Sequence, residues 1–346
     1  MSPREFERHE QVARLLRMAG LPPAIDIQAL PGGRNNKVFR VETPACAVLF
    51  KVYFNHPEDP RDRLAHEFAF LRHLAARGSR FAAKPLACDS LHHVGLMEFL
   101  EGQRPVLEEV DAAHIAEAVS FFYESNSHIT EEDRKYIPAA SEACFSIDDH
   151  VAGTGRRVAR LAHMLEDDDV DREAIAFVRD ELIPFWQRLQ TAVLQAAGPK
   201  GEDPILESER RLSPSDFGFH NSLRQADGML KFLDFEYAGW DDPAKLIIDF
   251  ANQPDMILPA PLEGIFRQAA IDNAPDPERL RRRVGLLEPV YQTKWACICL
   301  NDFLAFGRTR HRFTDGKKSD HRSRRIFQLG RAQTMMERAK TTFAIN

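Results

Sequence analysis

Two short segments hold most of the chemistry in this sequence: 213-SPSDFGFHN-221 and, a little further on, 232-FLDFE-236. The stretch between them is predicted to be a β-hairpin that turns at Ala-Asp-Gly. Such a hairpin brings Asp234 back beside Asn221, and Asp216 lies five residues before Asn221. A carboxylate that accepts a hydroxyl proton, with an amide and a second carboxylate that hold Mg²⁺ on a nucleotide, is the equipment of phosphoryl transfer. For any one of these residues taken alone, turn capping is the ordinary alternative.

A lysine and a glutamate upstream form the second candidate group. Lys51 lies in an apolar run predicted to be a buried strand, where an ammonium is costly unless an anion meets it. Glu67 lies in a predicted helix over 61–77 and projects from its apolar side, so it is a candidate counter-charge that would point the ammonium at phosphate oxygens. The alternatives are an edge-strand lysine that reaches water and an ordinary surface glutamate.

A turn rich in Gly and Asn, 30-LPGGRNN-36, precedes the strand predicted over 37–42. Its backbone N–H groups can close over an anion, with Gly33, Asn35 and Asn36 as the candidate nucleotide-binding positions. The turn lacks the Walker lysine and the spaced glycines of the dinucleotide fingerprint, so an ordinary hairpin turn is the alternative.

Because of these motifs, the sequence resembles the aminoglycoside phosphotransferase and choline kinase-like family of the protein-kinase-like fold. The resemblance runs over about 30–253. By this resemblance Asp216 is the catalytic base, Asn221 is a metal ligand, and Asp234 is the main Mg²⁺ ligand. Lys51 and Glu67 are the pair that positions the phosphates of ATP or GTP.

The resemblance also implies an α+β bilobal architecture. A small antiparallel-sheet lobe, residues 1–102, would bind the nucleotide and end in a hinge, and a larger, mainly helical lobe, residues 103–346, would carry the catalytic loop and substrate site. Met97, Glu98 and Phe99 resemble the hinge that binds adenine through its backbone. Asp249 and its neighbours resemble the helical aspartate that supports the catalytic loop.

Two positions depart from the family pattern. Pro214 stands where a histidine that supports the loop is usual, and Glu236 stands where the metal motif often has glycine. Neither change removes a phosphate or metal contact, which favours an active enzyme. A catalytically inactive nucleotide-binding regulatory protein of the same fold is the alternative, and a protein kinase is disfavoured because no long activation segment follows Asp234.

The acceptor is expected to be a hydroxyl of a small molecule, a sugar or polyol. The C-terminal region is locally basic, which disfavours a polycationic aminoglycoside. Unless its basic residues form a solvated helix face or a mobile loop, they would attract an anionic acceptor or cover the nucleotide. The other candidates for the substrate pocket are Trp240, the helix from Trp295, Asn301 and Asp302. The basic residues are Arg281, Arg282, Arg283, Arg308, Arg310, Arg312, Lys317, Lys318, Arg322, Arg324 and Arg325.

Composition bounds these expectations. The net charge of −6 argues against nucleic acid and anionic membranes as partners, and no apolar stretch is long enough for a membrane span. Five scattered cysteines make a poor disulfide framework, so a cytoplasmic location is expected; no feature indicates an oligomeric state. Further helices are predicted at 5–19, 111–125, 149–166, 170–198, 243–252, 262–272, 277–306 and 320–340, and further strands at 47–53, 86–89 and 94–100.

Overall fold

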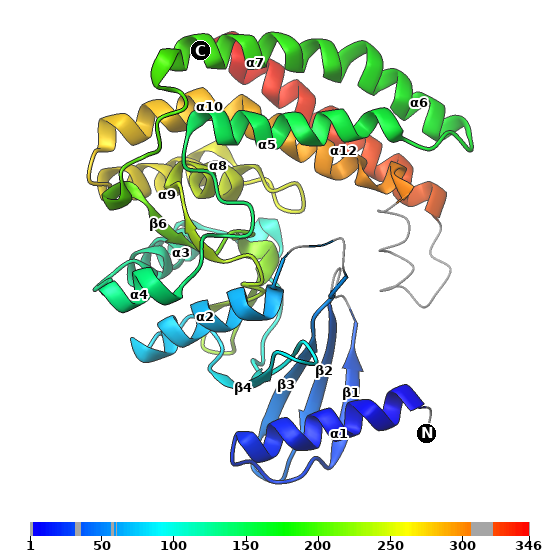
Figure 1. The fold of residues 1–346 in the computed structure, drawn as a ribbon, viewed down its shortest axis with the longest axis vertical. Coiled ribbons are helices and arrows are strands. Elements are labelled where there is room, and N and C mark those ends of the chain that lie inside the picture. Colours follow the sequence, from blue (N-terminus) through cyan, green and yellow to red (C-terminus); the bar gives the residue numbers. More distant parts are fainter. Residues whose placement is uncertain (1–2, 32–35, 57–58, 60, 306–320, 346) are drawn as a thin grey trace. The chain divides into compact units, whose positions relative to one another are not determined.

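The chain forms two compact units, each assembled from separate segments (Figure 1). The computed structural model describes residues 3–31, 36–56, 59, 61–305 and 321–345. The sheet unit contains Met1–Ser141 and Leu212–Trp240, and the helical unit contains Glu142–Arg211 and Asp241–Asn346. The two chemistry-bearing motifs therefore belong to the same unit as the N-terminal sheet. The lobe boundary expected after residue 102 stays a prediction.

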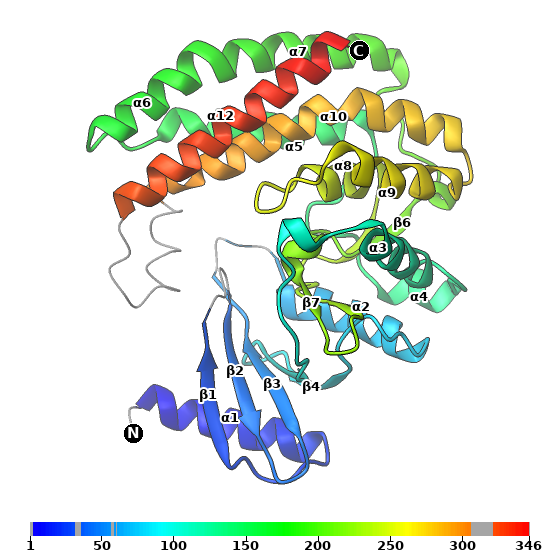
Figure 2. The same cartoon turned by 180° about the vertical axis from the view of Figure 1, so that it is seen from behind.

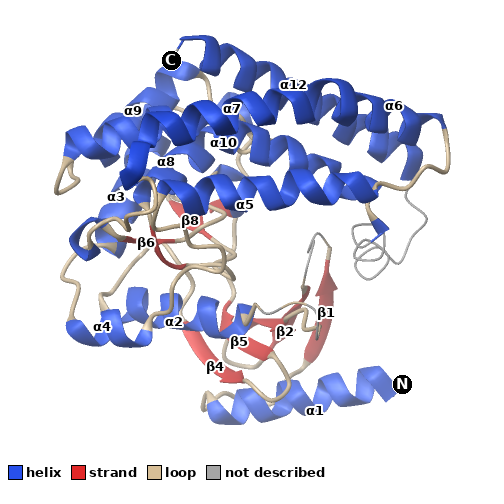
Figure 3. Ribbon diagram, turned by 45° about the horizontal axis from the view of Figure 1, so that its top comes forward, coloured by secondary structure: helices blue, strands red, loops and turns tan. Residues whose placement is uncertain are grey.

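The sheet unit is built on a five-stranded antiparallel sheet, which confirms the predicted fold class (Figure 3). The predicted strands at 37–42, 47–53 and 94–100 appear within two residues of their expected ends. The first strand was not singled out from the sequence, because its residues are mostly exposed and show no clear alternation. The strand order is β1-β2-β3-β5-β4, with β1 Asp26–Leu30, β2 Lys37–Glu42, β3 Ala47–Val52, β4 Pro85–Asp89 and β5 Val94–Glu98.

Two helices use opposite faces of this sheet. Helix α1, Pro3–Met18, packs Leu15 and its neighbours against Phe50 and the other side chains on one face. Because side chains alternate along a strand, the residues next to Phe50 in sequence point the other way. On that second face α2, Arg63–Ala76, places the ring of Phe68 against Gly95.

The rest of the sheet unit packs around a cluster of phenylalanines. Phe121 stacks on Phe232 with ring centroids 4.8 Å apart, and Phe217 lies at the same distance from Phe232. Phe217 and Phe235 directly follow the two motif aspartates in sequence, so this cluster anchors both motifs. The elements are η1 Leu107–Glu109, α3 Ala112–Ser125, α4 Glu131–Tyr136, η6 Phe219–Asn221, β7 Ser222–Arg224 and β8 Leu230–Phe232. The short strands β6 Arg211–Ser213 and β9 Gly239–Asp241 pair with each other.

The helical unit consists of long helices around their own apolar core (Figure 2). A π-helical turn joins α6 to α7 without a break, in agreement with the single helix predicted over 170–198. The helices are α5 Ile147–Arg160, α6 Asp169–Phe177, α7 Ile183–Ala197, α8 Pro243–Asn252, α9 Ala260–Asp272, α10 Pro277–Cys299 and α12 His321–Ile345. The short turns are η2 Leu161–His163, η3 Val178–Leu182, η4 Gly198–Lys200, η5 Glu207–Glu209 and η7 Leu300–Phe303.

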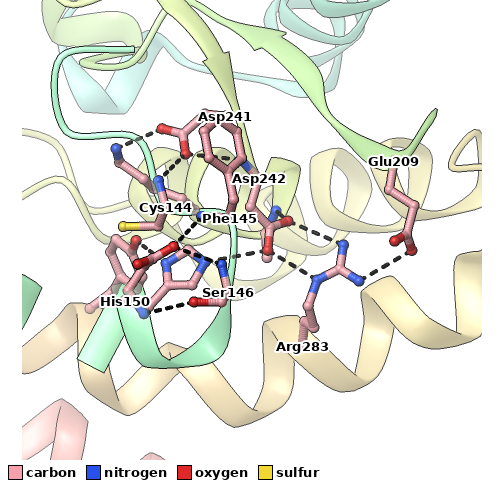
Figure 4. A network of polar contacts seen from close by, with 12 residues as sticks. Cys144, Phe145, Ser146, His150, Glu209, Asp241, Asp242 and Arg283 are labelled. Carbon is pink, nitrogen blue, oxygen red and sulfur yellow. Dashed lines mark hydrogen bonds and ion pairs between the residues drawn. The ribbon is translucent and has the colours of Figure 1, made fainter. Parts of the chain in front are cut away.

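A buried polar network fixes the start of α8 within the helical unit (Figure 4). Asp242 caps α8 through the Ala244 amide at 2.9 Å and accepts hydrogen bonds from Arg283, the shorter at 3.0 Å. His150 Nε2 lies 3.3 Å from the same carboxylate. Asp241 accepts from the backbone N–H of Cys144 at 2.8 Å, so α5, α8 and α10 are joined by buried charges that find partners inside the protein.

Within the described ranges, no helix has the length and apolar character that a membrane crossing requires. All five cysteines are free thiols.

Candidate active site

Lys51 lies at the centre of the candidate site, in the sheet unit. Its Nζ is 2.7 Å from Glu67 Oε2, so the predicted contact between β3 and α2 is present. Tyr53, two residues after Lys51 and just past the end of β3, donates its hydroxyl to the same oxygen at 2.6 Å. Burial and the Glu67 carboxylate raise the pKa of Tyr53, which keeps this donor protonated. The strand period of two was the sequence signal that would have found Tyr53.

Asp234 meets the other side of the lysine. Lys51 Nζ lies 2.7 Å from Asp234 Oδ1, and the Phe235 amide donates to Glu67 Oε1 at 3.2 Å. Desolvation raises the pKa of Asp234 to about 6, against the lowering effect of Lys51 and with the help of the neighbouring glutamates. Burial alone would lower the pKa of Lys51, but Asp234 and Glu67 outweigh it, so the lysine stays charged.

The backbone around Asp234 is held in an uncommon conformation. Asp234 has a φ of 65°, in the left-handed region that costs a residue with a side chain on the order of 1 kcal/mol. The Leu233 amide donates to the Asn221 carbonyl oxygen at 2.9 Å and so fixes the residue before this turn. The predicted return of Asp234 to Asn221 is thus achieved through the β7–β8 hairpin.

The loop of Asp216 closes on itself. Asn221 Nδ2 donates to the Asp216 carbonyl oxygen at 2.9 Å and lies 3.4 Å from its Oδ2. His220 Nε2 lies 3.2 Å from Asp216 Oδ1. The side chain of Asp216 remains 36% exposed, so its carboxylate is accessible from outside the protein.

The support expected from a histidine at Pro214 comes from the next residue instead. Ser215 Oγ donates to the Tyr237 carbonyl oxygen at 2.8 Å, and the Ser215 amide is 3.1 Å from Ser213 Oγ. Ser215, the residue before Asp216, also has a φ of 67°. Ser215 and Asp234 therefore both adopt the left-handed backbone conformation. The link from Ser215 to Tyr237 ties the two motifs together without a histidine at Pro214.

Glu236, the second departure, is a buried structural carboxylate. It accepts a short hydrogen bond from Asn36 Nδ2, and Arg63 Nε lies 3.6 Å from its Oε1. Asn36 Oδ1 in turn accepts from the Phe54 amide at 3.0 Å. Both polar ends of Asn36 are therefore used within the protein. Gly33 and Asn35, the other candidates in this turn, lie outside the described residues.

The predicted hinge residues lie at the end of β5. Met97 is buried within the sheet, and Glu98 is the last residue of the strand. The Glu98 amide donates to the Lys84 carbonyl oxygen at 2.9 Å. The ring of Phe99 lies under the guanidinium of Arg40, 4.6 Å from the ring centroid.

The basic residues of the C-terminal region are largely neutralised where the structure describes them. Arg324 donates to Asp302 at 2.7 Å, Arg322 donates to Asp169 at 2.6 Å, and Arg325 bonds to two aspartates of the helical unit. Arg281 pairs with Glu278 on its own helix. These contacts favour the structural alternative for this region. Arg308, Arg310, Arg312, Lys317 and Lys318 lie outside the described residues.

The helical aspartate Asp249 and the predicted pocket residue Asp302 are also paired. Asp249 accepts from Lys294 Nζ at 2.8 Å and from Trp295 Nε1 at 2.7 Å. Asp302 is bonded to Arg324, and Trp240 is buried in the sheet unit with Arg134 over its ring. Two carboxylates of the helical unit, Asp249 and Asp302, thus already have cations from the chain itself.

The comparisons with known proteins identify a family and a fold. The model of the phosphotransferase enzyme family matches residues 26–282, whereas no curated protein matches the sequence. Among solved structures, the ethanolamine kinase of Plasmodium vivax is similar with a TM-score of 0.59 and 13% identity, covering 91% of this chain and 81% of that one. The choline kinase of Streptococcus pneumoniae has a TM-score of 0.58 and 14% identity, covering 97% and 99%. An aminoglycoside phosphotransferase in complex with gentamicin has a TM-score of 0.59 and 14% identity, covering 95% and 97%. At these identities the structures show a shared kinase-like fold.

Proposed function

The chain belongs to the phosphotransferase enzyme family, and from that premise we propose that it moves the γ-phosphate of ATP or GTP to a hydroxyl of a small molecule. The observation that carries this proposal is the contact of Lys51 with both Glu67 and Asp234, beside the Asp216 loop. Nucleotide complexes among the similar structures, with ATP in one and ADP in another, support the choice of cofactor.

In this proposal the sheet unit binds the nucleotide. Lys51 would contact the phosphates, and Glu67 would hold its ammonium in place. Met97, Glu98 and Phe99 would receive the base, and the turn with Gly33, Asn35 and Asn36 would cover the phosphates. Because the Asn36 side chain already bonds to Glu236 and to the Phe54 amide, Asn36 would contact the phosphates through its backbone N–H.

Asn221 and Asp234 are the proposed holders of Mg²⁺. Their side chains fit a hard cation, because within the part of the chain that the structure describes no donor bonds to Asn221 Oδ1 or Asp234 Oδ2. Both oxygens belong to loops that are fixed by the hairpin. A bound Mg²⁺ would neutralise charge on the phosphates.

Asp216 is the proposed general base. The acceptor hydroxyl would lose its proton to the Asp216 carboxylate while its oxygen forms a bond to the γ-phosphorus, and the bond from that phosphorus to the nucleoside diphosphate would break. The link from Ser215 to Tyr237 supports activity over the inactive alternative, because it supplies the loop support that Pro214 lacks.

A sugar or polyol is the proposed acceptor class. The support is the pairing of Asp249 with Lys294 and of Asp302 with Arg324, which removes carboxylates that a polycation would need. The pairing of the described arginines likewise removes much of the reason to expect an anionic acceptor. The free thiols support a cytoplasmic site of action.

The test is a screen with ATP and with GTP, in Mg²⁺, against neutral sugars, polyols, sugar phosphates, choline, ethanolamine and gentamicin, with nucleoside diphosphate release as the readout. Asp216→Asn is expected to lower turnover at least about 100-fold and to spare nucleotide binding. Asp227→Asn, the same change on the exposed hairpin turn, is the matched control. Nucleotide binding without transfer to any acceptor would favour the inactive regulatory protein, and a preference for amines would refute the sugar or polyol assignment.

A further inference from the structure

His220 is a histidine of the catalytic loop to which the proposed mechanism assigns no role. Its Nε2 lies 3.2 Å from Asp216 Oδ1, and its side chain is 10% exposed, against 36% for Asp216. The buried ring of His220 thus contacts the more exposed carboxylate of Asp216. Such a contact can fix the orientation of the Asp216 carboxylate, the proposed base.

The other ring nitrogen indicates which tautomer is present. Nδ1 of His220 is buried and has no hydrogen-bond partner in the part of the chain that the structure describes. An ionised carboxylate only accepts hydrogen bonds, so Nε2 must carry the proton that faces Asp216. A hydrogen on Nδ1 would be buried without an acceptor, which is costly, so the tautomer that carries its hydrogen on Nε2 fits this geometry.

Gly218 makes room for this ring. A Cβ at Gly218 would lie 2.9 Å from His220 Nδ1 and 3.1 Å from its Cε1, closer than such atoms normally approach. The φ of Gly218 is 163°, extended backbone that other residues adopt. The constraint at this position is therefore the space beside the imidazole.

We propose that His220 is a positioning residue: its Nε2–H holds one carboxylate oxygen of Asp216, while Asn221 holds the Asp216 backbone, so that the base has a single orientation toward the acceptor hydroxyl. This inference rests on the proposed function of Asp216. The two contacts approach Asp216 from residues four and five positions further along the same loop. Misplacing a catalytic group by about 1 Å can reduce a rate about 100-fold, so the contact has a measurable effect on turnover.

The test compares His220→Gln, His220→Asn and Gly218→Ala with the wild type and with Asp216→Asn, using Mg²⁺–ATP and the best acceptor from the screen. His220→Asn, whose amide is too short to reach Asp216, and Gly218→Ala are expected to lower kcat about 10- to 100-fold, with the KM for ATP within about twofold. His220→Gln, whose amide can reach, should recover most of the rate. Gly264→Ala on α9, where the added Cβ meets nothing within 4 Å, is the matched control for the glycine change.

Activity and NMR results together separate the possibilities. If His220→Asn keeps the wild-type kcat while Asp216→Asn loses it, the positioning role is refuted and the proposed function stands. If Asp216→Asn also keeps the rate, the proposed function itself fails. Nitrogen NMR of the histidine rings in the wild type needs no substrate, so it tests the proposal even if the variants do not fold. A wild-type His220 protonated at Nε2 alone supports the proposal, and one protonated at Nδ1 alone overturns it.

Discussion

Lys51 Nζ lies 2.7 Å from Asp234 Oδ1, although 183 residues separate the two in sequence. The same ammonium lies 2.7 Å from Glu67, so one cation joins a strand of the sheet, a helix and the loop of the second motif. Two carboxylates held around one buried lysine are stable only while the lysine is charged. This relationship makes the site sensitive to changes at any of its three members.

Lys51→Met is expected to destabilise the protein by about 3 kcal/mol, because the nearly inaccessible Glu67 carboxylate would lose its cation. Transfer activity should also fall at least about 100-fold. Denaturant unfolding and nucleoside diphosphate release measure the two effects. Lys84→Met, at an exposed lysine, is the control, and equal stability of the two variants would contradict the prediction.

Gly95→Ala tests the packing of α2 on the sheet. An added Cβ would lie 2.4 Å from the ring of Phe68, which is itself buried. Overpacking of this kind is expected to cost about 1 to 3 kcal/mol in the free energy of unfolding. Gly264→Ala, in an exposed helical position, should instead be neutral or stabilising by up to about 1 kcal/mol. A Gly95→Ala protein as stable as the wild type would show that Phe68 can move.

The stability of the helical unit should fall at alkaline pH because of His150. Burial opposes its charge, but the bond to Asp242 outweighs this, and the pKa of His150 is raised from 6.5 to about 9. Since the folded pKa lies above the unfolded one, the stabilisation is full below about pH 6.5 and is lost as pH rises through 9, on the order of 3 kcal/mol in total. The surrounding network also holds the titratable groups of Asp242, Tyr291, Cys144, Arg283, Asp241 and Glu209.

Unfolding free energies of the wild type and His150→Gln between pH 6 and pH 9.5 measure this dependence, because the glutamine cannot titrate. The difference between the two proteins should shrink as the pH rises. A constant difference over this range would refute the charged state of His150.

Lys294→Met should destabilise the protein by about 3 kcal/mol or more, since Asp249 is buried and would keep only its bond from Trp295. Replacing both partners, as Lys294→Met with Asp249→Leu, should recover much of that loss, because no uncompensated charge remains. Thermal or denaturant unfolding of both variants provides the comparison. A double variant less stable than the single one would contradict the argument.

Local pattern predicted much of this protein. The helix over 243–252 and the strand over 37–42 appear with the expected bounds, because burial periodicity along a short segment reports on the face that an element turns to the core. The partnership of Lys51 with Glu67 also followed from local reasoning, since each residue sits on the apolar side of its own element. These are properties that a few neighbouring residues determine.

Only the tertiary structure revealed which distant side chains satisfy the buried charges. Glu236 looked like a tolerated departure from a motif, yet it is bonded to Asn36, 200 residues away. From sequence the C-terminal arginines could form either a solvated helix face or an anion-binding region, whereas Arg324 and its neighbours bond to aspartates of the same unit. A sequence specifies where a charge is buried, because burial follows from local pattern. Which opposite charge meets it depends on how elements far apart in the chain pack, and that was decided by the fold.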